Sequence, residues 1–265
     1  MPELKLSQIW IYPIKSLGGI SLNTSVVMKK GLQFDRRFML VDETGKFMTQ
    51  RVYPKMALFK MSIADHVLTI KYLQHTLNIA TQKIESGNPF NVTIWDDTVT
   101  AFEVDPSYSK WFSEHLELSC KLVHFPEENP RPVNPKYKVN DEHVSLADAY
   151  PFMIIGQSSL DDLNGRLDNP VPINRFRPNF VFTGGKPFEE DSWRNFSIGD
   201  NRFVGVKLCD RCVLTTVNQE TAEKGVEPLK TLATYRKWDN KIYLGQNLVA
   251  LDHYKVTVGD KIVLQ

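Results

Sequence analysis

Two of the three cysteines in the chain lie close together in the stretch VKLCDRCVLTTV, residues 206–217. Cys209 and Cys212 are three positions apart, and Arg211 stands between them. Cysteines at this spacing can form half of a zinc site, a redox pair, or one thiolate that binds a ligand beside an incidental neighbour. The rest of the chain must decide among these three interpretations.

The sequence lacks the additional features that a zinc site or a redox pair would require. Structural zinc takes four Cys or His ligands, usually as two close pairs, and the chain has no second CxxC and no HxxxH. A thioredoxin-like pair begins a helix, whereas the β-branched run CVLTTV predicts a strand. If residues 209–212 are extended, the two thiols point to opposite faces, and one stands alone beside Arg211, whose charge favours the thiolate. The alternative is that neither cysteine has a function, and that both are small buried side chains next to a solvated arginine.

Three other motifs, YPIKS, DRRF and NRFRPNF, place polar and cationic side chains at the ends of predicted strands. These side chains are Lys15, Ser16, Arg36, Arg37, Arg175, Arg177 and Asn179. Lysine and arginine donors of this kind suit a compact anion, phosphate above all. Because the motifs come from both halves of the chain, we expect them to converge on one cleft.

The elements that must position these residues are mostly strands. Short runs of alternating apolar and polar residues predict strands through most of the first hundred residues and again in the second half. PSYSKWFSEHLE (106–117) predicts a helix, and SSLDDLNGRL (158–167) predicts a short helix capped by Ser158. The predicted fold class is mainly β (α+β), with few helices.

The clearest change of composition is the segment 126–143, which holds four prolines and almost no apolar residue. Such a segment is typical of a linker or of a loop tied across a surface. It predicts two β-rich domains, one over residues 1–122 and the other over 123–265.

Composition also excludes several classes of function. The net charge of +1, from 32 basic and 31 acidic residues, disfavours a nucleic-acid binder. No strand–GxGxxG–helix unit and no P-loop occur, so dinucleotide and nucleotide triphosphate sites have no support. No apolar run is long enough to span a membrane, and three cysteines give no disulfide framework, so we expect a cytoplasmic protein.

The motifs YPIKS, DRRFMLVD, FRPNFVF, CDRCVLTTV, EPLKTLATYR and GQN occur in the order seen in MOSC proteins and cover nearly the whole chain. The chain resembles the two-domain members of that family, the amidoxime-reducing type and its bacterial relatives. The resemblance implies a β-barrel-like MOSC domain preceded by a smaller, β-rich MOSC N-terminal domain. It also favours the interpretation of the cysteine pair as one functional thiolate.

The resemblance implies the molybdenum cofactor, a molybdopterin-bound molybdenum, with Cys212 as its protein ligand and catalytic residue. Neither zinc nor pyridoxal phosphate is expected. The residues that would bind the cofactor by the same match are Lys15, Ser16, Arg37, Asp148, Ala149, Tyr150, Arg177, Asn179, Asp210, Arg211 and Asn247. The aromatic residue that follows selects Arg37 over Arg36, which stays the alternative.

The implied activity is reduction of N-hydroxylated compounds (amidoximes, N-hydroxylated bases, hydroxylamines) by removal of oxygen at molybdenum. Electrons would come from a separate donor protein, because the chain lacks the cysteine cluster that binds an iron–sulfur centre in some relatives. We expect no membrane anchor of the kind that mitochondrial members carry. The alternative function is a non-catalytic carrier of the molybdenum cofactor or of sulfur.

Overall fold

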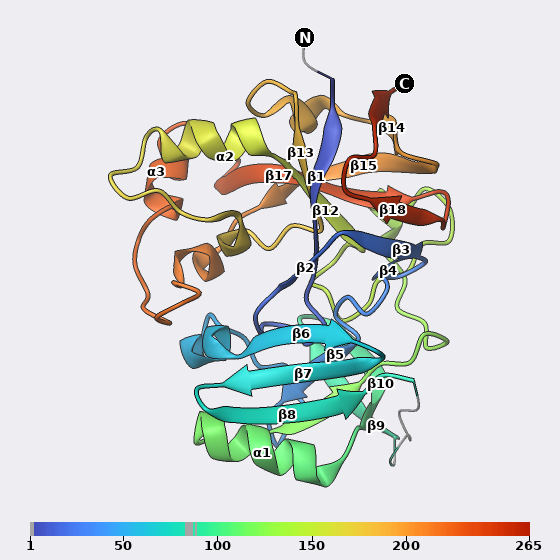
Figure 1. The fold of residues 1–265 in the computed structure, drawn as a ribbon, viewed down its shortest axis with the longest axis vertical. Helices are drawn as coiled ribbons and strands as arrows, with labels where there is room; N and C mark the ends of the chain where they lie inside the picture. The colour runs from blue at the N-terminus through green and yellow to red at the C-terminus, as the bar shows by residue number, and fades with distance from the viewer. Residues whose placement is uncertain (1–2, 83–86, 88) are drawn as a thin grey trace.

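The computed structural model describes residues 3–82, 87 and 89–265. Strands dominate it, with three α-helices and several short 3-10 helices in the described part of the chain. The strands are arranged in two lobes, one above the other in Figure 1. The predicted fold class, mainly β with few helices, is confirmed.

The upper lobe is built on a nine-stranded sheet in the order β19-β14-β15-β17-β12-β13-β1-β2, with β16 paired to β17. Its strands are β1 (Lys5–Ile11), β2 (Ile20–Leu22), β12 (Phe152–Gly156), β13 (Phe180–Thr183), β14 (Asn195–Ile198), β15 (Asn201–Asp210), β16 (Lys237–Trp238), β17 (Lys241–Ala250) and β19 (Ile262–Leu264). Only the pair β12–β13 is parallel among these described strands. A small sheet of β18 (Lys255–Thr257), β3 (Thr24–Met28) and β4 (Gly31–Leu32) lies beside it.

The lower lobe holds two antiparallel sheets and one helix (Figure 1). One sheet has the order β5-β11-β10-β9, and the other is the meander β6-β7-β8. Their bounds are β5 (Phe38–Val41), β6 (Lys60–Ala64), β7 (Val67–Tyr72), β8 (His75–Ala80), β9 (Pro89–Ile94), β10 (Asp97–Glu103) and β11 (Lys121–His124).

Across the described residues of both lobes there are five short 3-10 helices: η1 (Pro54–Leu58), η2 (Pro135–Tyr137), η3 (Ile173–Arg175), η4 (Glu189–Ser192) and η5 (Val213–Thr216).

Strand pairing does not divide the chain at residue 122. Strands β1 and β2 belong to the nine-stranded sheet, where β1 pairs with β13 from the second half. The buried face of β1 explains this, because Leu6, Ile9 and Ile11 enter the same core as Phe180 and Phe182. The sequence boundary stays a prediction, and in space the strands β1 to β4 lie with strands of the C-terminal half.

The three α-helices are α1 (Pro106–Leu116), α2 (Gln157–Asn164) and α3 (Leu229–Ala233). The predicted helix over 106–117 is confirmed as α1, where the Asp105 side chain accepts a hydrogen bond from the Ser107 amide at 2.7 Å. The predicted Ser158 cap of α2 is wrong. The helix starts directly after β12 with Gly156 as N-cap, which puts Ser158 inside the first turn.

The proline-rich segment 126–143 is a loop tied across the surface rather than a free linker. Arg131 is 2% exposed and donates to the carbonyl oxygens of Ser145 and Ala147, both at 2.6 Å. At the start of the segment, Lys30 Nζ donates to the Pro126 carbonyl oxygen at 3.0 Å. The segment therefore fixes the loop over 145–148 that precedes β12.

One hydrophobic cluster runs through both lobes. It contains Ile9 and Phe180 from the upper lobe together with Phe59 and Phe112 from the lower lobe. None of the helices in the described part of the chain has the length and apolar character needed to cross a membrane.

Candidate functional site

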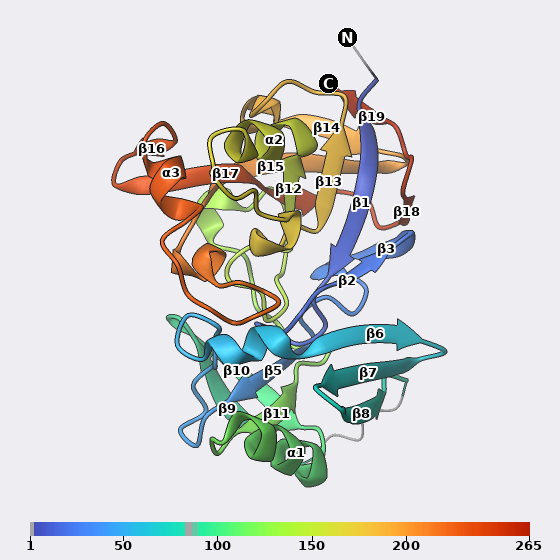
Figure 2. The same cartoon turned by 60° about the vertical axis from the view of Figure 1, so that its left-hand side comes forward.

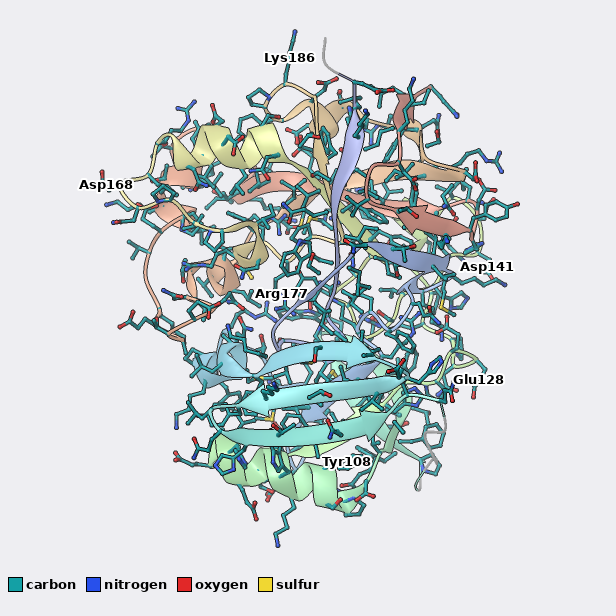
Figure 3. The ribbon with its side chains drawn as sticks, viewed as in Figure 1. Tyr108, Glu128, Asp141, Asp168, Arg177 and Lys186 are labelled. Atoms are coloured by element: carbon teal, nitrogen blue, oxygen red, sulfur yellow. The ribbon has the colours of Figure 1, made fainter. Side chains whose placement is uncertain are left out.

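A cleft of about 1090 Å³ lies between the lobes and draws its lining from both halves of the chain. Lys15 and Arg177, which are far apart in sequence, both line it, and Figure 3 places Arg177 where the lobes meet. The predicted residues that line it are Lys15, Ser16, Asp148, Ala149, Tyr150, Arg177, Asn179, Asp210, Arg211, Cys212 and Asn247. The prediction that the motifs converge on one cleft is confirmed.

Cys212 lies just beyond the end of β15, whose last residue is Asp210. The predicted strand over 212–217 is wrong, because Val213–Thr216 forms the 3-10 helix η5 with Cys212 as N-cap. The hydroxyl of Thr215 bonds back to the Cys212 carbonyl oxygen at 3.0 Å, which competes with strand pairing. From the other side, Arg175 Nε donates to the Thr215 carbonyl oxygen at 2.8 Å and fixes η5.

The two cysteines line the same cleft instead of facing opposite ways. The expectation of opposite faces assumed an extended chain, whereas the strand ends between the two residues. Cys209 is partly buried, and burial raises the pKa of its thiol. Cys212 is exposed, so it is the thiol more open to a ligand in the cleft.

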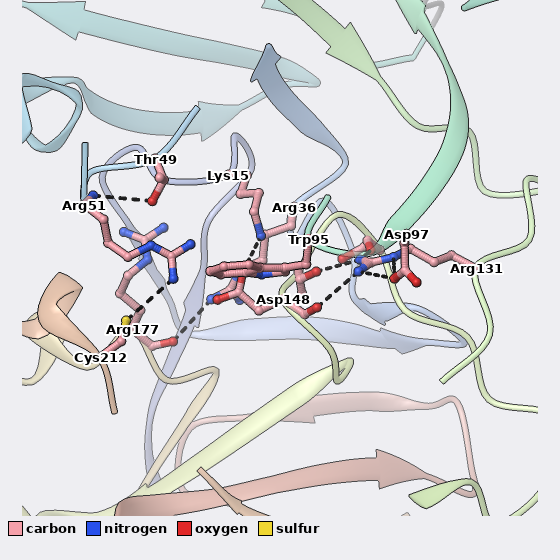
Figure 4. A network of polar contacts seen from close by, with 12 residues as sticks. Lys15, Arg36, Thr49, Arg51, Trp95, Asp97, Arg131, Asp148, Arg177 and Cys212 are labelled. Atoms are coloured by element: carbon pink, nitrogen blue, oxygen red, sulfur yellow. Dashed lines mark hydrogen bonds and ion pairs between the residues drawn. The ribbon is translucent and has the colours of Figure 1, made fainter. Parts of the chain in front are cut away.

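The cation beside the Cys212 thiol is Arg51. Its Nη1 lies 3.8 Å from Cys212 Sγ, within reach of a weak hydrogen bond (Figure 4). The guanidinium of Arg211 is directed to backbone carbonyls instead, with Nε 2.8 Å from the oxygen of Leu244 and Nη1 2.9 Å from that of Phe176. The cation that contacts the Cys212 thiol is therefore Arg51, from the other half of the chain, and not the neighbouring Arg211.

Tyr12 holds two arginines of the cleft apart. The guanidinium carbon of Arg36 is 4.3 Å and that of Arg177 is 4.1 Å from the centroid of its buried ring. Each cation is thus stabilised by the ring, which also separates the two like charges. Burial lowers the pKa of Arg177 to about 10, so it stays charged at neutral pH.

Arg36, not Arg37, lines the cleft. Arg36 Nη1 lies 2.6 Å from the buried Asp35 carboxylate, which also accepts a hydrogen bond from Asn179 Nδ2 at 3.1 Å. Arg37 points away, because its Nε donates to Glu127 at 2.7 Å and its Nη1 to the Asp35 carbonyl oxygen at 2.7 Å. The selection of Arg37 is thus corrected to Arg36.

Lys15 and Asp148 form an ion pair at 2.6 Å on the cleft wall. Burial lowers the pKa of Lys15 to about 8 and outweighs the opposing effect of Asp148. The surrounding protein atoms would raise the pKa of the Asp148 carboxyl, but Lys15 holds that pKa well below its usual range. At neutral pH both groups are charged.

Four cleft residues have left-handed backbones, which non-glycine residues rarely adopt. The φ angles are 65° at Ser16, 51° at Arg36, 56° at Trp95 and 54° at Arg177. Each such conformation costs on the order of 1 kcal/mol and persists only where surrounding contacts enforce it. Clustering of this strain is typical of a site whose geometry matters for function.

Other predicted residues support the walls. Asn179 Nδ2 also donates to the Trp10 carbonyl oxygen at 3.2 Å, and Ser16 accepts a hydrogen bond at its carbonyl oxygen from Gln50 Nε2 at 2.8 Å. Asp210 lies 3.6 Å from Lys207 Nζ and 3.4 Å from Lys241 Nζ. Ala149, Tyr150 and Asn247 also line the cleft.

The sequence reasoning missed several lining residues, among them Thr49, Arg51, Trp95, Arg131 and Lys207. The segment after Cys212 brings some of them into place, since Lys224 Nζ donates to the Arg51 carbonyl oxygen at 2.7 Å and Gln219 pairs with Gln50. Figure 2 shows this segment, in orange, reaching toward the lower lobe. One signal was available, because Trp95 is followed by Asp96 and Asp97, which interrupt the alternation of the stretch FNVTIWDDTVTAFEV.

The donor set fits a soft metal carried by an anionic cofactor. An exposed cysteine can ligate such a metal, and the cations Lys15, Arg36 and Arg177 can neutralise an anion beside it. No group of three or more His, Cys, Asp or Glu side chains in the described residues is arranged to hold a metal ion. A metal brought by a cofactor needs only a single protein ligand.

Comparison with known proteins gives matches over nearly the whole chain. The MOSC N-terminal beta barrel domain matches residues 3–119, and the MOSC domain matches residues 141–263. The mitochondrial amidoxime-reducing component 1 of Mus musculus is 32% identical over 98% of this chain and 82% of its own length. The human protein of that name is 30% identical with the same coverage. The molybdenum cofactor sulfurase of Arabidopsis thaliana is 30% identical over 92% of this chain, which spans only 33% of that protein.

Proposed function

This chain belongs to the MOSC family, and we propose that it is a molybdenum-cofactor-dependent reductase of N-hydroxylated compounds. The observation that carries the proposal is one exposed cysteine, Cys212, in a cationic cleft built from both halves of the chain. The names of the amidoxime-reducing relatives support the substrate class, since the matches span nearly the full chain.

In this proposal Cys212 ligates molybdenum, and Lys15, Arg36 and Arg177 bind the anionic groups of the cofactor. When bound, the cofactor supplies two-electron oxygen-transfer chemistry that no side chain of the protein offers. Ser16, Ala149, Tyr150, Asn179, Asp210, Arg211 and Asn247 shape the surrounding walls. The ion pair of Lys15 with Asp148 keeps the lysine charged at neutral pH, so it can attract an anion.

The overall reaction consumes two electrons and two protons for each N–OH bond converted to N–H, with release of one water. The chain has three cysteines, which are too few for a four-cysteine iron–sulfur centre. We therefore propose a separate electron-donor protein as partner and a small N-hydroxylated molecule as substrate.

A second candidate function is a non-catalytic carrier of the molybdenum cofactor or of sulfur. The exposure of Cys212 favours it, because a carrier must present its thiol to a partner. The similarity to molybdenum cofactor sulfurase supports it as well.

Metal analysis followed by an activity assay separates the two functions. The purified protein is analysed for molybdenum and then given an amidoxime with an artificial low-potential reductant. A reductase contains about one molybdenum per chain and forms the amidine over many turnovers. A carrier of the cofactor binds molybdenum but forms no product. Absence of molybdenum after cofactor-replete expression would refute the reductase and the cofactor carrier, and would leave only the carrier of sulfur.

A further inference from the structure

Trp95 lies at the tip of the hairpin formed by β9 and β10, in the lower lobe, and reaches the cleft. Its side chain is 48% exposed, although its backbone is held at a φ of 56°. The indole Nε1 donates to the Asp148 Oδ1 at 3.1 Å, so the carboxylate and the ring stand side by side (Figure 4). The ring packs beside Phe47, with centroids 5.2 Å apart, and stays half-exposed. A large aromatic side chain held at such backbone cost and left half-exposed is suited to receiving a ligand.

The planar guanidinium of Arg51 lies over the Trp95 ring. The guanidinium carbon of Arg51 lies 4.1 Å from the Trp95 ring centroid, and Arg51 Nη1 lies 3.8 Å from Cys212 Sγ. The Arg51 guanidinium thus contacts both the indole ring and the thiol. Figure 4 shows the Arg51 side chain reaching toward Cys212, with Trp95 and Asp148 nearby.

Only weak contacts of its guanidinium hold Arg51 in this position. Its guanidinium has no carboxylate within 4 Å among the described residues, in contrast to Arg36 and Arg131, which have Asp35 and Asp97. The contact with sulfur is long, at 3.8 Å, and a stack of an exposed cation on an aromatic ring is a weak interaction. A ligand with the same shape and charge could displace it.

We propose that the Trp95 face and the Asp148 carboxylate form a subsite for the planar amidine or guanidine group of the substrate, and that Arg51 fills this subsite when no substrate is bound. The proposal rests on the proposed function and narrows its substrate class to planar N-hydroxylated amidines and guanidines. Trp95 is then a specificity-determining residue for the reaction.

Charge explains why this wall suits the substrate rather than the cofactor. Lys15 Nζ and Trp95 Nε1 both donate to Asp148 Oδ1, so the other carboxylate oxygen is the one that a planar cation in the subsite would meet. That oxygen repels an anionic phosphate, whereas it attracts an amidinium. An amidoxime is neutral, and its reduced product is an amidinium cation, so positive charge grows on the planar group as oxygen leaves nitrogen. Asp148 and the indole face stabilise that charge more in the transition state than in the bound substrate.

Calorimetric titration with benzamidinium chloride tests the subsite without any turnover. We expect Trp95→Leu to weaken benzamidinium binding about five- to thirtyfold, and Trp95→Phe, which keeps an aromatic face, to weaken it less. Arg51→Ala should strengthen binding, because it removes the group that fills the subsite. Trp238→Leu is the matched control, since Trp238 is also partly exposed but does not line the cleft. Equal affinity in wild type and Trp95→Leu would overturn the subsite.

Steady-state selectivity gives the second readout. For Trp95→Leu we expect kcat/KM for benzamidoxime to fall at least fivefold more than kcat/KM for an N-alkylhydroxylamine, with unchanged molybdenum content. Equal losses for both substrates would overturn the specificity role. If the wild type reduces neither compound but loses benzamidinium affinity on Trp95→Leu, the subsite stands and the proposed reductase function fails.

Discussion

Arg36 and Arg37 are adjacent in the sequence but have different environments. Arg36 lines the cleft beside Tyr12, whereas Arg37 is turned toward Glu127 and the Asp35 carbonyl oxygen. At the scale of single residues, we therefore propose a role in anion binding for Arg36 and a role in stability for Arg37.

Substitution of both arginines by glutamine tests this assignment. Arg36→Gln should lower cofactor affinity, because a lost charge-assisted contact is worth about 1.5–3 kcal/mol. Arg37→Gln should lower the free energy of unfolding by roughly 1–3 kcal/mol but leave molybdenum per folded chain near the wild-type value. Molybdenum content after dialysis, divided by the folded protein measured by circular dichroism, checks both. A larger molybdenum loss in Arg37→Gln would restore the sequence-based assignment.

Arg36 and Arg37 also show where sequence reasoning stops. Residue types in YPIKS, FRPN and CDRC were enough to predict the cationic cleft and its cysteine. Strand alternation could not select between the two arginines, because Arg36 has a φ of 51° and lies before β5 begins. Arg51 and Trp95 escaped prediction because their partners Cys212 and Asp148 are distant in sequence, at separations of 161 and 53 residues.

At the scale of elements, the segment 126–143 supports the site through Arg131. This buried side chain binds the carbonyl oxygens of Ser145 and Ala147, and it lies 2.7 Å from the Asp97 carboxylate of β10. It therefore ties the loop that carries Asp148 to the lower lobe. The composition of the segment allowed either a linker or a tied loop, and one buried arginine decides between them.

Arg131→Met should lower the free energy of unfolding by roughly 2–4 kcal/mol, because it leaves the buried carbonyl oxygens of Ser145 and Ala147 without a donor. Its partner Asp97 is half-exposed and stays solvated in the variant. Arg166→Met is the control, since Arg166 pairs with Asp162 on the exposed side of α2 and its loss should cost less than about 0.5 kcal/mol. Urea unfolding of both variants gives the comparison. Similar losses in the two would show that the segment is not held by Arg131.

A second element-scale feature is the buried carboxyl of Glu190 beneath the start of α2. It accepts hydrogen bonds from the Gly156 amide at 3.1 Å and the Ser159 hydroxyl at 2.8 Å. Burial raises the pKa of Glu190 from 4.5 to about 7. The folded protein thus binds this proton more tightly than the unfolded chain does.

The sign of the pH effect follows from that difference. The contribution of the protonated Glu190 carboxyl to the free energy of unfolding is fully present below pH 4.5 and is lost as pH rises through about 7. Glu190→Gln removes the titration, so the stability of wild type relative to the variant should fall between pH 5 and pH 7.5, by on the order of 3 kcal/mol. Chemical unfolding at several pH values measures it. A difference that does not change with pH would show that Glu190 keeps its ordinary pKa in the fold.

At the scale of the whole molecule, the cleft exists because two lobes share one hydrophobic cluster and the chain crosses between them. Strands β1 and β2 start the chain in the upper lobe, residues 38–124 build the lower lobe, and the segment 126–143 returns to the upper lobe (Figure 1). Lys15 and Arg51 thereby face Arg177 and Cys212 across one cleft. Its central feature is that Cys212 alone would hold the metal.

Molybdenum content of the single variants Cys212→Ser and Cys209→Ser, expressed side by side with the wild type, tests that claim most directly. Cys209 is the matched control, because it lines the same cleft but is partly buried with a raised thiol pKa. We predict that Cys212→Ser loses reductase activity and most of its molybdenum, while Cys209→Ser keeps most of both. Equal loss in the two variants, or full activity in Cys212→Ser, would contradict the account.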